Sequence, residues 1–152
     1  MFHCSTHSFS IGDRVQCGRW GAGFNNYTYG VTNIHATNAW RLASELILEQ
    51  VRHLHFSSKP SRFNCTFAFE TLQEAQSCPA NPGTMIFEVT PTDSNPTIHR
   101  GSLSILNANS RFNAQFPFLQ HNRQIALNYW AGMESGLMEL AIGCDLNIIR
   151  IV

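Results

Sequence analysis

Residues 62–74 read RFNCTFAFETLQE, and this stretch predicts a strand that runs directly into a short helix. Four apolar residues alternate with polar or small ones, which is the period of a half-buried strand: Phe63, Cys65, Phe67 and Phe69. Thr71 and Glu74 have the spacing of a capping box, so a helix should begin after Thr71 and run to about Ser77. The rest of the fold must supply strands that pair with this one.

The remaining segments predict more strands and two longer helices, without regular alternation. Residues 17–33 are rich in Gly, Asn and aromatic residues and are expected to form a long loop. Because no strand–helix–strand unit repeats, the fold class is α+β, not a doubly wound parallel sheet. Short strands are expected within 1–10, 11–15, 85–90, 102–106, 138–142 and 146–152, the last two forming a hairpin, and helices over 37–53 and 122–130.

The helix expected from residue 37 or 38 to 53 is amphipathic. Arg41 and Glu45 form an i,i+4 pair, which is typical of a solvated helix face. This pattern assigns the helix no part in any chemistry. The opposite stripe should be buried and contains Trp40, Ala43, Ile47, Val51 and Leu54.

Length and charge exclude several classes of protein. A chain of 152 residues fits one domain, spanning 1–152. Ten basic residues balance ten acidic ones, so no net positive field favours nucleic acid. No apolar run is long enough to span a membrane, and the first residues lack the pattern of a signal peptide. A cytoplasmic protein without membrane partners is expected.

The five cysteines are scattered and form no Cys-x-x-Cys pair. An odd number of dispersed cysteines fits free thiols in a reducing compartment better than a disulfide framework. Structural zinc requires clustered thiolates and imidazoles, so no metal site is expected. The sequence also lacks the glycine-rich phosphate-binding motifs and the nucleophile elbow of hydrolases.

Three settings stand out as candidates for chemistry: His3-Cys4-Ser5, the aromatic strand around Phe67, and Glu139. Glu139 lies in the apolar run 138–142, and burying an ionised carboxylate there is costly unless it is paired. Considered alone, a position on the solvent face of an edge strand is the better interpretation. The order of the three settings along the chain favours a role of Glu139 in chemistry instead.

This order of His, aromatic and Glu resembles the ADP-ribosyltransferase fold, in the branch typified by diphtheria toxin and the poly(ADP-ribose) polymerases. The resemblance implies split antiparallel β-sheets with a few flanking helices. His3-Cys4-Ser5 resembles the His-Gly-Ser or His-Gly-Thr of that branch, and 66–69 resembles its Tyr-Phe-Ala strand. Residues 139–142 and 146–151 resemble the strand with the catalytic Glu and the final strand. Two positions depart from the pattern, because Cys4 replaces the Gly and Phe67 replaces the tyrosine.

The resemblance implies a role for each matching residue. Glu139 would be catalytic, stabilising the oxocarbenium-like transition state as nicotinamide leaves. His3 would hold the adenosine ribose, and Cys4 would bind the nicotinamide amide through its backbone, next to Ser5. Phe67 would stack on the nicotinamide ring. Structural roles remain open for His3 and Phe67.

Two further charged residues are candidates for the site. Arg62 would clamp the pyrophosphate through its bidentate fork, unless it is simply a surface charge. Glu134, in a Gly-flanked loop, is a rival carboxylate that would orient the acceptor.

The function implied is an NAD+-dependent mono-ADP-ribosyltransferase, with NAD+ as co-substrate and a protein or a nucleic acid (RNA or DNA) as acceptor. Small stand-alone enzymes of this fold are often bacterial or phage-related toxins that an inhibitor protein neutralises. Two alternatives stay open. One is transfer to water, as in an NAD+ glycohydrolase, and the other is a non-catalytic relative that binds a nucleotide or a partner.

Overall fold

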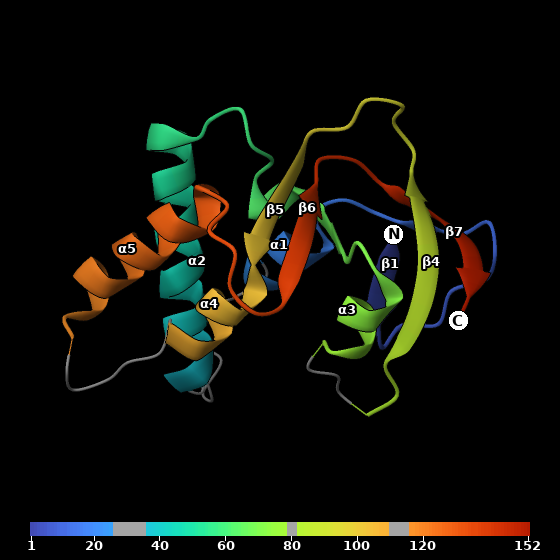
Figure 1. Cartoon of the computed structure of the whole chain (residues 1–152), viewed down its shortest axis with the longest axis horizontal. Helices are drawn as coiled ribbons and strands as arrows, with labels where there is room; N and C mark the ends of the chain where they lie inside the picture. Colours follow the sequence, from blue (N-terminus) through green and yellow to red (C-terminus); the bar gives the residue numbers. More distant parts are fainter. Residues whose placement is uncertain (26–35, 79–81, 110–115) are drawn as a thin grey trace.

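Two antiparallel sheets form the centre of the computed structural model, which describes residues 1–25, 36–78, 82–109 and 116–152. The four-stranded sheet has the order β1-β4-β7-β2, and the three-stranded sheet has the order β3-β6-β5 (Figure 1). The expected α+β class with antiparallel sheets is therefore confirmed. The strands are β1 (Phe2–Ser5), β2 (Arg14–Val15), β3 (Thr66–Ala68), β4 (Met85–Pro91), β5 (Ile98–Ser102), β6 (Met138–Ile142) and β7 (Leu146–Ile151).

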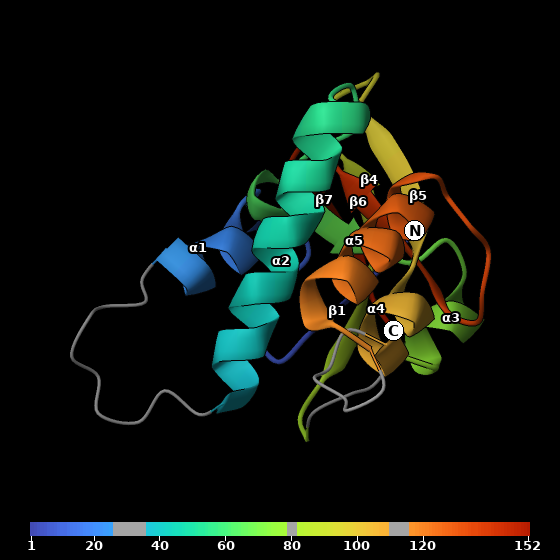
Figure 2. The ribbon, with the colours of Figure 1, turned by 90° about the vertical axis from the view of Figure 1, so that its left-hand side faces the viewer.

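The helices gather mainly beside the three-stranded sheet. The long α2 packs against α5, and both lie on the β5–β6 side of the molecule (Figures 1 and 2). One apolar core joins α2, α4 and α5, and a second lies between the strands of the two sheets. The helices are α1 (Arg19–Asn25), α2 (Ala36–His55), α3 (Leu72–Gln76), α4 (Leu103–Asn109) and α5 (Phe118–Trp130), with a 3-10 turn η1 (Arg62–Asn64).

The last two strands occupy different sheets, so the expected hairpin of 138–142 and 146–152 is wrong. β6 pairs with β3 and β5, whereas β7 pairs with β4 and β2. The turn between them carries the chain from one sheet to the other. Thr66 holds this turn, because its hydroxyl donates to the carbonyls of Ile142 and Cys144. β6 consequently becomes the central strand of its sheet.

Several local predictions are confirmed. Thr71 caps α3, and both bonds of the capping box with Glu74 are present. The strand expected at 85–90 is β4, and the inward residues of α5 include Ile125, Ala126 and Tyr129 as expected. These segments carry strong local signals, which explains why the sequence alone suffices for them.

Other local predictions are wrong. The expected loop 17–33 contains α1, and its residues 26–33 lie outside the described part of the chain. The strand expected at 102–106 is the start of α4, where the Ser102 hydroxyl accepts the backbone N–H of Ile105. The strand expected from residue 62 begins only at 66, because η1 precedes it. α5 begins at Phe118, earlier than expected from Asn122.

The buried face of α2 differs from the predicted stripe. Leu54 is 65% exposed, whereas Glu45, expected in solvent, is only 6% exposed. Ile47 and Val51 are buried as expected, but Ser44 and Leu48 complete the face that meets α5. The face is rotated because α2 contacts both α5 and η1.

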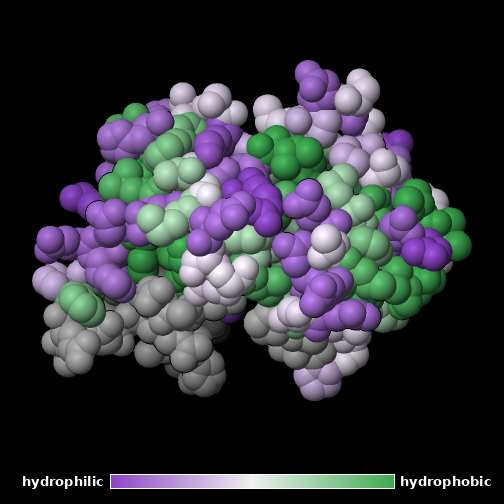
Figure 3. All heavy atoms as spheres, viewed as in Figure 1, coloured by the Kyte–Doolittle hydropathy of each residue, from purple (hydrophilic) through white to green (hydrophobic). Residues whose placement is uncertain are grey.

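The surface is mixed in polarity. Figure 3 shows hydrophobic residues interspersed with hydrophilic ones, with more of them on the β4–β7 side, where Ile149 and Ile151 are exposed. Within the described ranges, no helix is long and apolar enough to cross a membrane.

Candidate functional site

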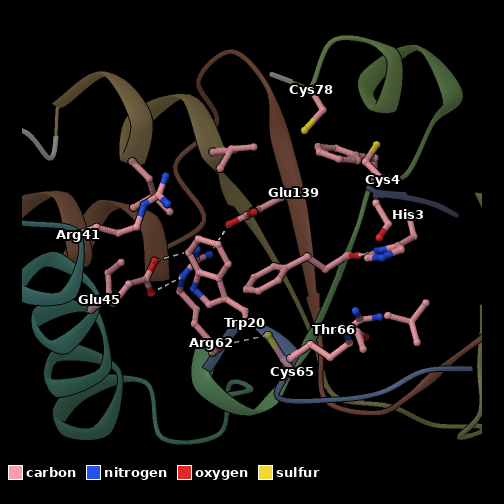
Figure 4. Close-up of a pocket in the computed structure, with 18 of the residues that line it drawn as sticks. His3, Cys4, Trp20, Arg41, Glu45, Arg62, Cys65, Thr66, Cys78 and Glu139 are labelled. Carbon is pink, nitrogen blue, oxygen red and sulfur yellow. Dashed lines mark hydrogen bonds and ion pairs between the residues drawn. The ribbon is translucent and has the colours of Figure 1, made fainter. Parts of the chain in front are cut away.

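A cavity of about 430 Å³ opens between the two sheets and α2. Its walls come from β1, β3, β6, α1, α2 and η1 (Figure 4). The volume lies in the range of small-molecule sites, about 300–1,000 Å³. All six residues expected to carry the chemistry line it: His3, Cys4, Ser5, Arg62, Phe67 and Glu139.

Glu139 projects from β6 into this cavity and is only 5% exposed. The interpretation as a wet residue on an edge strand is therefore wrong, because β6 is the central strand of its sheet. Its Oε1 accepts the Tyr129 hydroxyl at 3.0 Å and forms an ion pair with Arg62. Within the described part of the chain, Oε2 has no hydrogen-bond partner. One carboxylate oxygen is thus anchored, and the other is free for a ligand.

Arg62 lies at the start of η1, which Ser61 caps, and it is 4% exposed. The interpretation as a surface charge is wrong. Its Nε donates to Glu45 at 2.9 Å, Nη2 donates to the same carboxylate at 3.2 Å, and Nη1 donates to Tyr129 at 2.7 Å. Burial alone would lower the Arg62 pKa, but the carboxylates of Glu139 and Glu45 raise it well above its usual value. Arg62 is therefore a fixed cation with four of its five N–H donors in hydrogen bonds.

Tyr129 completes this network from α5. Burial and the neighbouring Glu139 raise the Tyr129 pKa well above its usual value, although Arg62 opposes the shift. The phenol therefore stays protonated and donates to Glu139. Gly101 of β5, which faces Glu139 in the sheet register, makes room for this ring, because a Cβ there would overlap the Tyr129 ring.

His3 lies on β1, across the cavity from α2 (Figure 4). Its Nδ1 is 2.7 Å from the carbonyl oxygen of Phe67, which can only accept, so Nδ1 carries the proton. Burial lowers the His3 pKa, and the charge of Arg19 lowers it further, against the opposing bond to Phe67. The ring is therefore neutral near pH 7, and its Nε2 is a hydrogen-bond acceptor.

Phe67 lies on β3 between His3 and the carboxylate network. The Arg62 guanidinium carbon lies 4.7 Å from its ring centroid, and Trp20 meets it edge-on at 6.3 Å. The side chain of Cys4 turns toward α3, where its thiol donates to the carbonyl of Ala75 at 3.4 Å. The Ser5 hydroxyl accepts the backbone N–H of His7 at 3.0 Å.

The comparison with known families gives one match. A family model described as a protein of unknown function, DUF2441, matches residues 16–152. The chain belongs to the DUF2441 family. No curated protein matches the sequence. The matched span contains Glu45, Arg62, Phe67 and Glu139, whereas His3 lies before it.

The site of this DUF2441 protein includes residues that the sequence pattern missed. Glu45 was placed on a solvated face, and its pairing with Arg62 shows only in the tertiary structure. Trp20 was placed in a loop, yet it lines the cavity from α1, and its buried Nε1–H has no partner among the described residues. Arg19 and Arg41 also line the cavity, and neither pairs with a carboxylate in the described part of the chain.

Glu134, the rival carboxylate, lies outside the cavity wall. Its side chain is 76% exposed and pairs with Arg100 at 2.5 Å. The described ranges hold no group of three or more His, Cys, Asp or Glu residues that could bind a metal ion. Within the DUF2441 chain, the cavity offers one anchored carboxylate, a neutral imidazole acceptor, an aromatic face and two unpaired arginines.

Proposed function

We propose that the protein is an NAD+-dependent ADP-ribosyltransferase that transfers ADP-ribose to a macromolecule. The observation that carries this proposal is the convergence of His3, Phe67 and Glu139. They come from three strands in two sheets, and they line one cavity in which the carboxylate is buried. This arrangement supplies a sugar-binding acceptor, a stacking surface and a fixed negative charge at one site.

The electrostatics of the carboxylate network suit a reaction in which positive charge develops. Arg62 is shared by Glu45 and Glu139, so this trio has one carboxylate more than it has cations. The Glu139 carboxylate of this trio is buried at the cavity wall, which Arg19 and Arg41 also line. Preorganised charge of this kind stabilises an oxocarbenium-like transition state more than the neutral ground-state sugar. The free Oε2 of Glu139 would accept a hydroxyl of the nicotinamide ribose.

His3 and Phe67 would position the dinucleotide around this charge. Because Nε2 of His3 accepts, it suits a ribose hydroxyl donor. The guanidinium of Arg62 lies over the Phe67 ring, so nicotinamide would stack on the opposite face. Loss of the tyrosine hydroxyl at this position removes one hydrogen bond but leaves the stacking face.

Arg19 and Arg41 are better candidates for the diphosphate than Arg62. The donors of Arg62 are bonded to Glu45, Tyr129 and Glu139. The guanidinium carbons of Arg19 and Arg41 lie instead 5.4 Å from the centroid of Phe9 and 5.5 Å from that of Trp20. Aromatic rings hold the two cations in place while their N–H groups stay available for phosphate oxygens.

The decisive experiment incubates the purified protein with NAD+ labelled in the adenine moiety. Separate reactions receive lysate protein, RNA and single-stranded DNA as acceptors. Label in one of these pools, with release of nicotinamide, supports the proposal and identifies the acceptor class. Nicotinamide release without a labelled pool would point to hydrolysis instead, and neither product would overturn the proposal.

A further inference from the structure

Two cysteines from distant parts of the sequence meet at one end of the cavity. The Cys4 thiol donates to the carbonyl oxygen of Ala75 at 3.4 Å, and the backbone N–H of Cys78 donates to the same oxygen at 3.2 Å. Both cysteines line the cavity, where Figure 4 shows them at the end nearest α3. Each is partly exposed, so a small solute can reach both.

The two thiols also influence each other electrostatically. The neighbouring Cys4 lowers the Cys78 pKa, and the neighbouring Cys78, together with burial, raises the pKa of Cys4. The Cys78 thiolate is therefore the more available nucleophile of the pair. Two other cysteines differ, because burial raises the pKa of Cys65 to about 12 and that of Cys17 to about 11.

We propose that Cys4 and Cys78 form a reversible disulfide when the protein meets hydrogen peroxide. The Cys78 thiolate attacks one peroxide oxygen, the O–O bond breaks, and a sulfenic acid forms as water leaves after protonation. The Cys4 thiol then attacks the sulfenic sulfur, the S–S bond forms, and a second water leaves. Two electrons pass from the two thiols to the peroxide, and a dithiol reductant reverses the change.

The bond would change the cavity. Cys4 neighbours His3 on β1, whereas Cys78 follows α3, so a disulfide would join these two elements across one end of the cavity. The site would then admit ligands less readily. The effect on ADP-ribose binding rests on the proposed function. The disulfide itself forms whether or not the protein binds a nucleotide.

The test treats the reduced full-length protein with hydrogen peroxide, blocks free thiols with an alkylating reagent, and digests without reduction. Cleavage with trypsin and then with a Glu-specific protease separates all five cysteines. Cys4 lies in residues 1–14, Cys17 in 15–19, Cys65 in 63–70, Cys78 in 75–88 and Cys144 in 140–150. Mass spectrometry of the linked peptides then identifies the pair.

The expected product is a link between 1–14 and 75–88 that dithiothreitol removes and that is absent in Cys78→Ser. A matched Cys144→Ser variant should form it as the wild type does. Alkylation of both Cys4 and Cys78 after treatment, or a link that joins Cys17 to Cys144 instead, would overturn the proposal. ADP-ribose binding, measured before and after oxidation, should weaken about tenfold. If the oxidised protein binds ADP-ribose as tightly as the reduced protein, the disulfide does not restrict the cavity. If the reduced protein does not bind ADP-ribose, the result counts against the proposed function and not against the disulfide.

Discussion

Glu45 and Glu139 bond to the same guanidinium, although one lies on α2 and the other on β6. Arg62 thereby connects the helical part of the molecule to the central strand of the smaller sheet. The buried cation is fully paired, and the trio that it forms with the two carboxylates has one negative charge in excess. This relationship explains how a carboxylate in an apolar strand finds an ion-pair partner in a buried place.

Glu45→Gln should lower kcat about tenfold and change KM for NAD+ little. The substitution keeps the shape of the side chain but removes the excess negative charge of the trio. It should therefore raise the free energy of the transition state, in which positive charge develops, more than that of the bound substrate. Steady-state kinetics of nicotinamide release measure both constants. Glu88→Gln, at an exposed pair with Arg150, is the matched control and should leave both unchanged. An equal loss in both variants would contradict the role given to Glu45.

Arg62→Met should destabilise the fold by about 3–5 kcal/mol, because it leaves two buried carboxylates without their cation. Urea denaturation followed by circular dichroism measures the free energy of unfolding. Arg150→Met removes an exposed pair and should cost about 1 kcal/mol or less. If the two variants lose a similar free energy of unfolding, the buried ion pairs of Arg62 do not stabilise the fold more than an exposed pair does.

Arg41→Gln and Arg19→Gln should each raise the Kd for ADP-ribose about fivefold, because each loses about 1 kcal/mol of contact with the diphosphate. Isothermal titration calorimetry measures this, with adenosine as a ligand that lacks phosphate. Arg123→Gln, on the exposed face of α5 and away from the cavity wall, serves as the control. Unaltered ADP-ribose affinity in both cavity variants would assign the diphosphate to other residues.

His99 should make the protein less stable in mild acid. Burial lowers its pKa to about 4, and the charge of Lys59 acts in the same direction. The neutral ring bonds to Lys59 at 3.0 Å and to the Tyr129 carbonyl at 2.9 Å. Because the unfolded chain binds a proton near pH 6.5 and the folded one only near pH 4, stability should fall as pH drops between these values.

Denaturation curves at pH 7.5, 5.5 and 4.5 test this dependence. The slope of unfolding free energy against pH should be shallower in His99→Gln than in the wild type, while the exposed His53→Gln variant should retain the wild-type slope. A slope that is the same in all three proteins would show that another group governs the acid response.

The sequence predicted the elements whose signals are local. The capping box of Thr71 and Glu74 and the alternating strand at 85–90 needed no tertiary information. The α+β class followed from the order of these elements. The antiparallel pairing and the placement of β6 and β7 in separate sheets depend on long-range contacts, which a single sequence does not show.

The candidate site was only partly accessible from the sequence. His3, Phe67 and Glu139 were selected by their order, and the cavity brings them together. Glu45 was missed because its i,i+4 partner Arg41 made it look solvent-facing, while its actual partner is Arg62. Arg62 was selected because charged residues are scarce in this sequence and because it directly precedes an aromatic strand. No local pattern showed which residues its N–H groups bond to.

Glu139→Gln tests the central claim most directly, with Glu134→Gln as its matched control on the exposed loop. Both variants are compared with the wild type for transfer of label from NAD+, for NAD+ binding and for thermal stability. Loss of the charge should reduce transfer about 100-fold or more in Glu139→Gln, with binding and folding largely retained, while Glu134→Gln transfers normally. Wild-type transfer by Glu139→Gln would contradict the account.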